Sequence, residues 1–176
     1  MKAIRYATAF MMTALAACSS QKAVTDNAQP ANINVLCYNI HHANPPSTPD
    51  KIDIPAIAKV INDTKPDIVA LQEVDVHTDR SGKSLHQAEE LARLSGMKAF
   101  FAKGIDYGGG EYGVAILSRY PILETNRYPL TTVAGTNGEP RVLATALLQV
   151  PGNPKVLTAC TDLDAQPGDT NRSVQI

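Results

Sequence analysis

Short apolar runs alternate with an amphipathic segment near the start of the chain. Residues Ile33–Ile40 form an apolar run rich in strand-forming residues, and its length suits a buried strand. A helix is predicted next, because Asp53 can cap it and Pro55 suits its first turn. Its apolar positions recur at helical spacing, at Ile54, Ile57, Ala58 and Ile61. A second apolar run, Ile68–Leu71, ends at Gln72-Glu73, so the pattern predicts a strand–helix–strand unit with parallel strands.

This predicted unit brings two polar residues together. Both strands of a right-handed crossover point the same way, so their carboxyl ends emerge at one edge of the sheet. Asn39 closes the first strand and Glu73 closes the second. Open α/β sheets tend to bind ligands in crevices at such an edge. We therefore expect Asn39 and Glu73 to line a ligand-binding crevice.

The remaining pattern predicts one more helix and a set of antiparallel strands. After a polar loop, Ser84 and Gln87 have the spacing of a capping box for a helix that ends before Gly96. A strand is expected near Met97–Ala102, before the flexible run Gly108–Gly110. Two hairpins follow, Tyr112–Arg119 with Ile122–Leu130 and Val142–Val150 with Lys155–Cys160. This order of elements predicts an α+β fold.

Composition narrows the class of protein. The chain has 176 residues, of which 44% are hydrophobic and 19% charged, so it can form one domain with a substantial core. The formal net charge of −1 argues against a protein that grips long nucleic acid, which usually needs a basic face. A small substrate that contains phosphate remains compatible with this charge.

The first residues have the pattern of an export signal. Lys2 and Arg5 precede a short apolar run, Tyr6–Ala17, which is too short to span a bilayer. The run ends in Leu15-Ala16-Ala17-Cys18, which resembles the lipobox of bacterial lipoproteins and implies lipidation of Cys18. An ordinary secretory signal with an incidental cysteine is the alternative. The predicted division is a signal peptide at 1–17, a lipidated cysteine and polar tether at 18–31, and one domain at 32–176. The expected location is the bacterial cell envelope, where acyl chains would anchor the exported protein to a membrane.

Two further cysteines remain in this oxidising compartment. Cys37 and Cys160 could form a disulfide, but the sequence does not show whether their Cα atoms lie close enough to pair. We expect two buried free thiols instead.

Asn39 and Glu73 also have the donor chemistry of a metal site. An amide oxygen and a carboxylate suit a hard cation such as Mg²⁺ or Mn²⁺. On spacing alone, a turn-forming asparagine and a solvated glutamate are the simpler interpretation.

Five ordered segments strengthen the metal interpretation. The first two are Val35–Ile40 (VLCYNI) and Asp67–Val74 (DIVALQEV), followed by Tyr112–Arg119 (YGVAILSR), Glu139–Arg141 (EPR) and Thr161–Asp164 (TDLD). Together they resemble the endonuclease/exonuclease/phosphatase family, which includes DNase I-like nucleases, bacterial sphingomyelinases and inositol polyphosphate phosphatases. The resemblance implies a two-sheet α/β sandwich, with helices on the outer face of a mixed sheet. It also implies metal-dependent hydrolysis of a phosphate ester.

The resemblance assigns expected roles by position. Glu73 would be the principal metal ligand, with Asn39 beside it on Mg²⁺ or Mn²⁺. Arg80 and Arg141 would contact the substrate phosphate, although solvated loop arginines are an equally good interpretation. The cleft would be lined by His41, His42 and Tyr112, each of which could equally be an ordinary loop or packing residue. The expected substrate is a small or lipid-linked phosphate ester rather than long nucleic acid.

The sequence departs from the family pattern in two places. The family usually has Thr-His-Leu-Asp where this chain has Thr161-Asp162-Leu163-Asp164, and that histidine commonly contacts phosphate. Later Gly-Asp-Phe-Asn and Ser-Asp-His segments have no counterpart in the sequence. These departures predict the N-terminal half of the domain, inactive or incomplete as a phosphodiesterase or nuclease-like hydrolase. The alternative is a non-catalytic relic or binding lipoprotein. An apolar inner sheet face, from Val35, Val69 and Ile116, is expected to lack its partner sheet.

Overall fold

The strand–helix–strand unit forms as predicted. The computed structural model describes residues 32–49, 51–152 and 154–176. Strand β1 (Val35–Asn39) pairs in parallel with β2 (Ile68–Val76), and helix α1 (Ile54–Thr64) makes the crossover between them. The Asp53 carboxylate accepts a hydrogen bond from the Ala56 amide, which confirms the predicted cap of α1.

Helix α2 begins later than the capping-box pattern predicts. It spans Gln87–Ser95, its N-cap is His86, and Gly96 ends it in the left-handed conformation with φ of 65°. The amide of His77 donates to the Leu85 carbonyl, and His86 forms a bridge with Val76. The backbone before Gln87 is therefore held in extended pairing, which prevents a helix from starting at Ser84.

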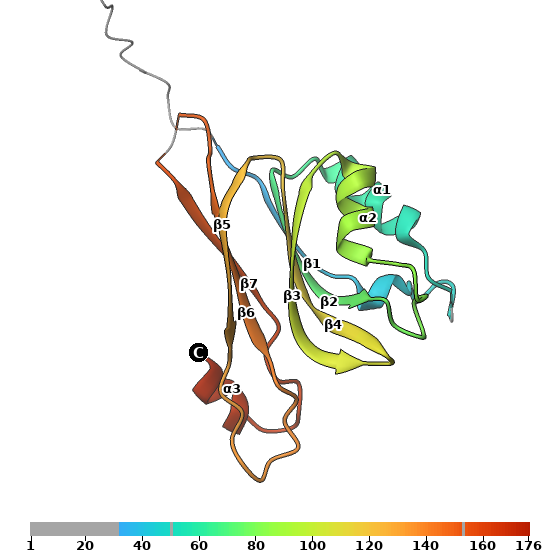
Figure 1. The fold of residues 1–176 in the computed structure, drawn as a ribbon, viewed down its shortest axis with the longest axis vertical. Helices are drawn as coiled ribbons and strands as arrows, with labels where there is room; N and C mark the ends of the chain where they lie inside the picture. The colour runs from blue at the N-terminus through green and yellow to red at the C-terminus, as the bar shows by residue number, and fades with distance from the viewer. Residues whose placement is uncertain (1–31, 50, 153) are drawn as a thin grey trace, which may run out of the picture.

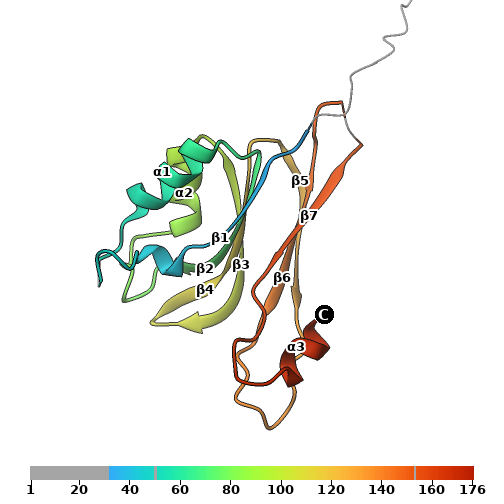
Figure 2. The same ribbon diagram turned by 180° about the vertical axis from the view of Figure 1, so that it is seen from behind.

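Two sheets pack face to face, and α1 and α2 cover the outer face of the first (Figures 1 and 2). The first sheet has the order β1-β2-β4-β3, and the second has the order β5-β6-β7. The remaining elements are η1 (His41–Ala43), β3 (Lys98–Tyr107), β4 (Gly110–Ser118), β5 (Ile122–Pro129), β6 (Val142–Leu148), β7 (Val156–Thr161) and α3 (Thr170–Gln175). The β6–β7 hairpin is confirmed, but the hairpin predicted from β4 and β5 is wrong. Strand β4 pairs with β2 and β3, whereas β5 pairs with β6, so the turn at Tyr120-Pro121 carries the chain from one sheet to the other.

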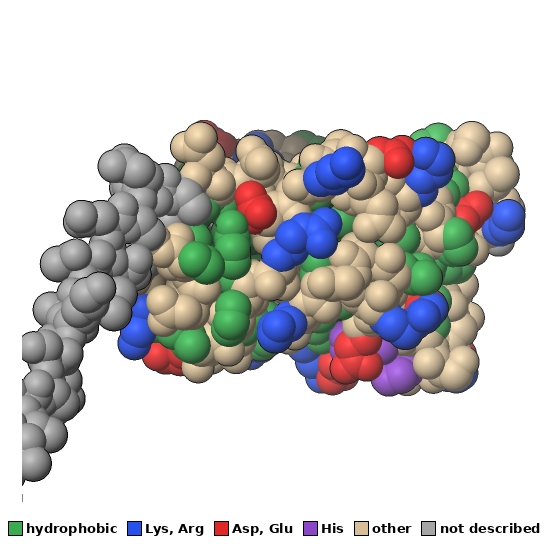
Figure 3. All heavy atoms as spheres, turned by 90° about the horizontal axis from the view of Figure 1, so that it is seen from above, with side chains coloured by type: hydrophobic (Ala, Val, Ile, Leu, Met, Phe, Trp, Pro, Cys, Tyr) green, Lys and Arg blue, Asp and Glu red, His purple; other side chains and the backbone are tan. Residues whose placement is uncertain are grey.

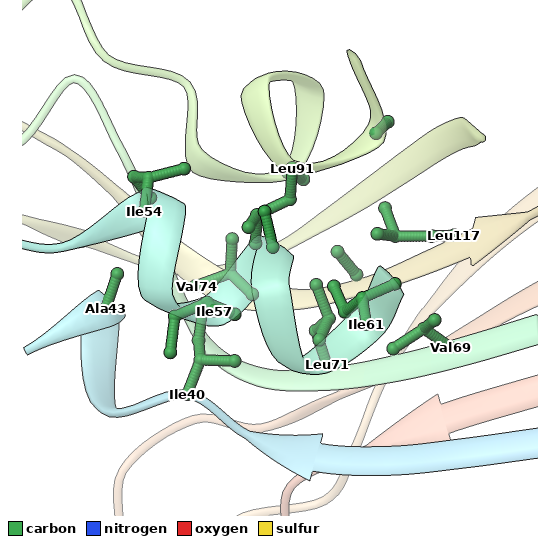
Figure 4. Packing of buried hydrophobic residues seen from close by; sticks show 14 residues of the cluster. Ile40, Ala43, Ile54, Ile57, Ile61, Val69, Leu71, Val74, Leu91 and Leu117 are labelled. Carbon is green, nitrogen blue, oxygen red and sulfur yellow. The ribbon is translucent and has the colours of Figure 1, made fainter. Parts of the chain in front are cut away.

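The first sheet buries a separate apolar cluster on each face. The outer cluster lies under the two helices and contains Ile57 and Ile61 of α1, Leu91 of α2, and Leu71 and Val74 of β2 (Figure 4). The inner cluster joins the two sheets and contains Ile68, Ala70, Ala102, Val114, Ile116, Val142, Ala144, Ala146, Leu148, Val150 and Cys160. The molecule is thus a three-layer arrangement of helices, sheet and sheet.

The expectation of an uncovered inner face is therefore wrong. Ile116 is fully buried against the second sheet, and Val69 lies in the outer cluster beneath the helices. Val35 is 60% exposed because it lies on the edge strand β1 and belongs to neither cluster. The three antiparallel strands after Tyr120 provide the missing layer.

The two cysteines of the described residues are unpaired, as expected, but only one is buried. Cys37 is exposed on β1, whereas Cys160 is buried between the sheets. Burial raises the pKa of the Cys160 thiol to about 12. The Gln72 amide nitrogen lies 3.5 Å from the Cys37 sulfur and 3.3 Å from the Cys160 sulfur, so one side chain separates the thiols.

The predicted signal segment, Cys18 and the polar tether lie outside the described residues. Within the described residues, no helix is both long and apolar enough to cross a bilayer.

Candidate functional site

A bulge in β2 exposes Glu73 at the site. Leu71 pairs with Ala115 and Val74 pairs with Gly113, so Gln72 and Glu73 together oppose one residue of β4. Leu71 and Val74 both enter the outer cluster although they lie three positions apart, and a regular strand would have placed residue 73 there instead. Glu73 has φ of 58°, the left-handed conformation of a bulge that redirects a side chain. The prediction that β2 ends at Glu73 is therefore wrong, because β2 continues to Val76.

The side chains of Asn39 and Glu73 meet, as the parallel unit predicts. The Asn39 Nδ2 donates to Glu73 Oε1 at 2.8 Å, and Asn39 Oδ1 accepts from the His41 amide at 2.9 Å. Asn39 thus holds the carboxylate and the start of the following turn in a fixed relation. One lone pair of its amide oxygen remains available to a cation.

The turn after β1 is strained. His41, His42 and Ala43 have φ of 46°, 44° and 59°, a left-handed conformation that costs about 1–2 kcal/mol for each residue with a Cβ atom. The side-chain amide of Gln87 donates to the His42 carbonyl at 2.7 Å, and the backbone amide of Asp53 donates to the Ala43 carbonyl at 2.7 Å. Such strain persists only where surrounding contacts hold it, and it is concentrated at functional sites.

Arg80 is fixed by a buried carboxylate that sequence reasoning missed. Its Nε and Nη2 each donate to Asp75 at 2.8 Å, and its guanidinium lies 4.3 Å from the centre of the Tyr107 ring. Asp75 is fully buried. Burial favours its neutral form, but hydrogen bonds from Arg80, Ser81 and Thr78 outweigh burial and lower its pKa. A charged residue between two valines, in Val74-Asp75-Val76, was the signal that could have revealed this pair.

Arg141 is paired as well. Its Nη1 donates to Asp162 at 2.8 Å and lies 3.3 Å from Glu139, while its buried Nε has no partner among the described residues. Burial raises the pKa of Asp162, and Glu73 adds to this effect, although Arg141 opposes it. The guanidinium that was expected to contact phosphate therefore forms an ion pair with Asp162.

Tyr112 lies at the centre of these groups. It lines a small cavity of about 10 Å³ with Glu139, Arg141 and Asp162, which is room for about one water molecule. The Arg80 guanidinium lies 5.5 Å from the centre of its ring. Burial and the charge of Glu73 raise the Tyr112 pKa, so the phenol stays protonated and can donate a hydrogen bond. Every residue that the sequence nominated within the described region therefore lies around one site.

Surface charge is mixed on the face of the molecule seen from above (Figure 3). On the face shown in Figure 3, lysine and arginine side chains are interspersed with acidic ones instead of forming a continuous basic surface. This distribution agrees with the near-neutral net charge.

A sequence model of the endonuclease/exonuclease/phosphatase family matches residues 36–164. The chain belongs to this family. A similar solved structure is an endonuclease/exonuclease/phosphatase from Beutenbergia cavernae DSM 12333, with 26% identity and a TM-score of 0.68 over 81% of this chain and 42% of that one. No curated protein sequence matches the chain.

Two further structures share the fold. The human Nocturnin catalytic domain, solved with a bound sulfate anion, has 24% identity and a TM-score of 0.58 over 81% of this chain and 54% of that one. A functionally unknown conserved protein from Enterococcus faecalis V583 has 18% identity and a TM-score of 0.61 over 81% of this chain and 57% of that one. The present chain therefore spans about half the length of the structures that it matches.

Releasing Arg141 should strengthen anion binding. In Asp162→Asn the nearer of the two carboxylates paired with Arg141 loses its negative charge and Glu139 remains at 3.3 Å, so we expect inorganic phosphate to bind about tenfold more tightly, or about 1.4 kcal/mol. Isothermal titration at neutral pH measures this change. Asp106→Asn is the control, because Asp106 is an exposed partner of Lys103 on β3. Unchanged or weaker phosphate binding in Asp162→Asn would contradict the prediction.

Proposed function

We propose that this domain forms the metal- and phosphate-binding part of a divalent-metal-dependent phosphoesterase site. Family membership supports a hydrolase of the phosphoesterase or nuclease-like type. The bulge at Glu73 is the observation that carries the proposal, because it removes a carboxylate from the core and directs it toward Asn39. The catalytic activity of the whole protein and the identity of its substrate are part of the same proposal.

The charges around Glu73 favour a cation. Asp75 is neutralised by Arg80, and Asp162 and Glu139 share Arg141. Within the described residues, no lysine or arginine forms an ion pair with Glu73. Its only side-chain hydrogen bond there comes from the neutral Asn39 amide. A half-buried carboxylate without a countercharge, beside an amide oxygen, suits Mg²⁺ or Mn²⁺.

The protein groups around this site have complementary roles. Glu73 and Asn39 would hold the ion, which when bound neutralises charge that develops on phosphoryl oxygens. Arg80 would orient the phosphate through Nη1, which also donates to the Tyr107 hydroxyl at 3.4 Å, since Asp75 accepts from Nε and Nη2. Tyr112, kept protonated, would donate a hydrogen bond to a phosphate oxygen.

The proposed substrate is a small or lipid-linked phosphate ester within reach of the bacterial envelope. The formal net charge of −1, and the interspersed charges on the face shown in Figure 3, support this choice over long nucleic acid. Lipidation at Cys18 would place the domain beside a membrane through the polar tether, as the lipobox-like segment suggests.

Metal binding tests the proposal directly. Titration of the purified chain with Mg²⁺ and with Mn²⁺ should show one site, and Glu73→Gln should weaken binding of both ions about 100-fold because it removes the anionic ligand. Glu124→Gln is the matched control, since Glu124 is exposed on β5. Equal Mg²⁺ and Mn²⁺ affinity in the wild-type chain and in Glu73→Gln would refute the proposed function.

A non-catalytic binding protein is the second candidate. The observation that favours it is the Arg141–Asp162 pair, which places a carboxylate where the family usually has a phosphate-contacting histidine. Hydrolysis of bis(p-nitrophenyl) phosphate with Mg²⁺ or Mn²⁺ distinguishes the two. Turnover that disappears in Glu73→Gln supports the enzyme, whereas metal and phosphate binding without turnover supports the binding protein.

A further inference from the structure

The strained turn after β1 places two imidazoles against the carboxylate of Glu73. His41, His42 and Glu73 each offer one potential ligand atom, and these three atoms lie within 4.8 Å of one another. The two imidazole rings have centroids 4.4 Å apart. Successive side chains of a regular strand point to opposite faces, so the left-handed turn is what allows neighbouring histidines to converge.

The hydrogen bonds of His41 leave a nitrogen ready to bind metal. Its Nδ1 lies 3.0 Å from the Asn44 carbonyl oxygen, which can only accept a hydrogen bond. The neutral ring therefore carries its proton on Nδ1, and the lone pair is on Nε2. Ligating histidines in proteins are commonly fixed in this way by a carbonyl or carboxylate on the other ring nitrogen.

His42 supplies a second, independent observation. Its Nδ1 is buried and has no hydrogen-bond partner within the described residues. A buried polar atom without a partner is rare in folded proteins and calls for an unseen partner such as an ion. The ring also borders a solvent-open hollow of about 320 Å³ with Asn44, Ile52 and Arg80, through which an ion can enter.

Contacts from Gln87 and Asn39 hold the turn in place through its backbone and leave the imidazole nitrogens unused. Gln87 is fully buried and binds the His42 carbonyl, so it fixes the backbone of the turn. The Asn39 side chain binds both the His41 amide and Glu73 Oε1. Asn39 therefore links the histidine turn to the carboxylate.

We propose that His41, His42 and Glu73 form a site for a borderline transition-metal ion of the Zn²⁺ class. Two imidazole nitrogens and one carboxylate suit Zn²⁺ or Co²⁺, whereas Mg²⁺ prefers oxygen ligands and retains its waters. The inference rests on the proposed function, because Glu73 belongs to both ligand sets. It identifies which class of ion this site prefers.

Titration with Zn²⁺ and Mg²⁺ tests the proposal. The wild-type chain should bind Zn²⁺ at least 100-fold more tightly than Mg²⁺. His41→Gln and His42→Gln should each weaken Zn²⁺ binding at least tenfold and leave Mg²⁺ binding within about twofold. His77→Gln is the matched control, because His77 is exposed and also has a left-handed backbone, with φ of 58°. Zn²⁺ affinity that is equal in the wild-type chain and both variants overturns the proposal.

A measurement on the wild-type chain does not depend on the variants folding. Paramagnetic Co²⁺ should shift the ring proton resonances of His41 and His42 strongly and those of His77 and His86 weakly. Four histidine resonances that respond equally, or not at all, overturn the proposal.

The two proposals fail in different ways. Suppose that Glu73→Gln loses Mg²⁺ and Mn²⁺ binding, while His41→Gln and His42→Gln leave Zn²⁺ affinity unchanged. This result would retain the proposed function and reject the transition-metal site. Histidine-dependent Zn²⁺ binding in a chain that binds neither Mg²⁺ nor phosphate would retain the transition-metal site and reject the proposed function.

Discussion

Replacing Asp75 with alanine is expected to lower the free energy of unfolding by about 3 kcal/mol. Asp75 is fully buried in β2 and accepts hydrogen bonds from Arg80, Thr78 and Ser81. Its removal leaves two buried hydroxyls and a guanidinium without their acceptor. Because the Arg80 side chain is 32% exposed, water can solvate part of its charge, which keeps the expected loss at the lower end for a broken buried ion pair.

Chemical denaturation measures this loss, with Asp79→Ala as the control. Asp79 lies in the loop that follows β2 and pairs with Lys83, but its side chain is 70% exposed, so its loss should cost less than about 1 kcal/mol. A similar destabilisation of both variants would show that the loop is generally sensitive and that the buried pair has no special role.

The Asp75 effect should also depend on pH. The pKa of this carboxyl is lowered in the folded state, so its contribution to stability is fully present above the unfolded pKa of about 4. That contribution is lost as pH falls through the folded pKa. The difference in unfolding free energy between wild type and Asp75→Asn should therefore be constant near neutral pH and shrink below about pH 4. A difference that grows in acid would contradict the assigned direction of the shift.

Replacing Ile116 with alanine is expected to cost about 3 kcal/mol of unfolding free energy, because it opens a cavity between the two sheets. Ile116 is fully buried and packs in the cluster that contains Ala144, Ala146 and Leu148 of the second sheet. If the inner face were uncovered, as the sequence alone suggested, this substitution would cost little and would reduce self-association.

Thermal and denaturant unfolding, together with light scattering, distinguish these outcomes. Leu157→Ala is the control, because Leu157 lies on β7 of the second sheet with 67% of its surface exposed. It should change stability by less than about 0.5 kcal/mol. A monomeric chain in which Ile116→Ala and Leu157→Ala are equally stable would contradict the observed packing of the two sheets.

Local pattern was sufficient to predict the strand–helix–strand unit and the meeting of Asn39 with Glu73. The Asp53 cap, the apolar stripe of α1 and the two short apolar runs are each specified within a few residues. The rule that parallel crossovers are right-handed then brings the strand ends together. The ordered motifs likewise identified the family before any geometry was known. The local elements depend on short-range chemistry that periodicity captures, whereas the family was recognised from the resemblance of its motifs.

Only the tertiary structure decided the rest. Whether β5 pairs with β4 or with β6 depends on which apolar faces must cover each other, and both β4 and β6 are buried along most of their length. The bulge at Glu73 arises because Leu71 and Val74 both pack under the helices, whose residues lie elsewhere in the chain. The left-handed turn at His41–Ala43 is held by Gln87 and Asp53, which lie elsewhere in the chain. The sequence by itself determined the local elements, the family and the candidate residues, whereas long-range packing decided how the two sheets pair and how the site is shaped.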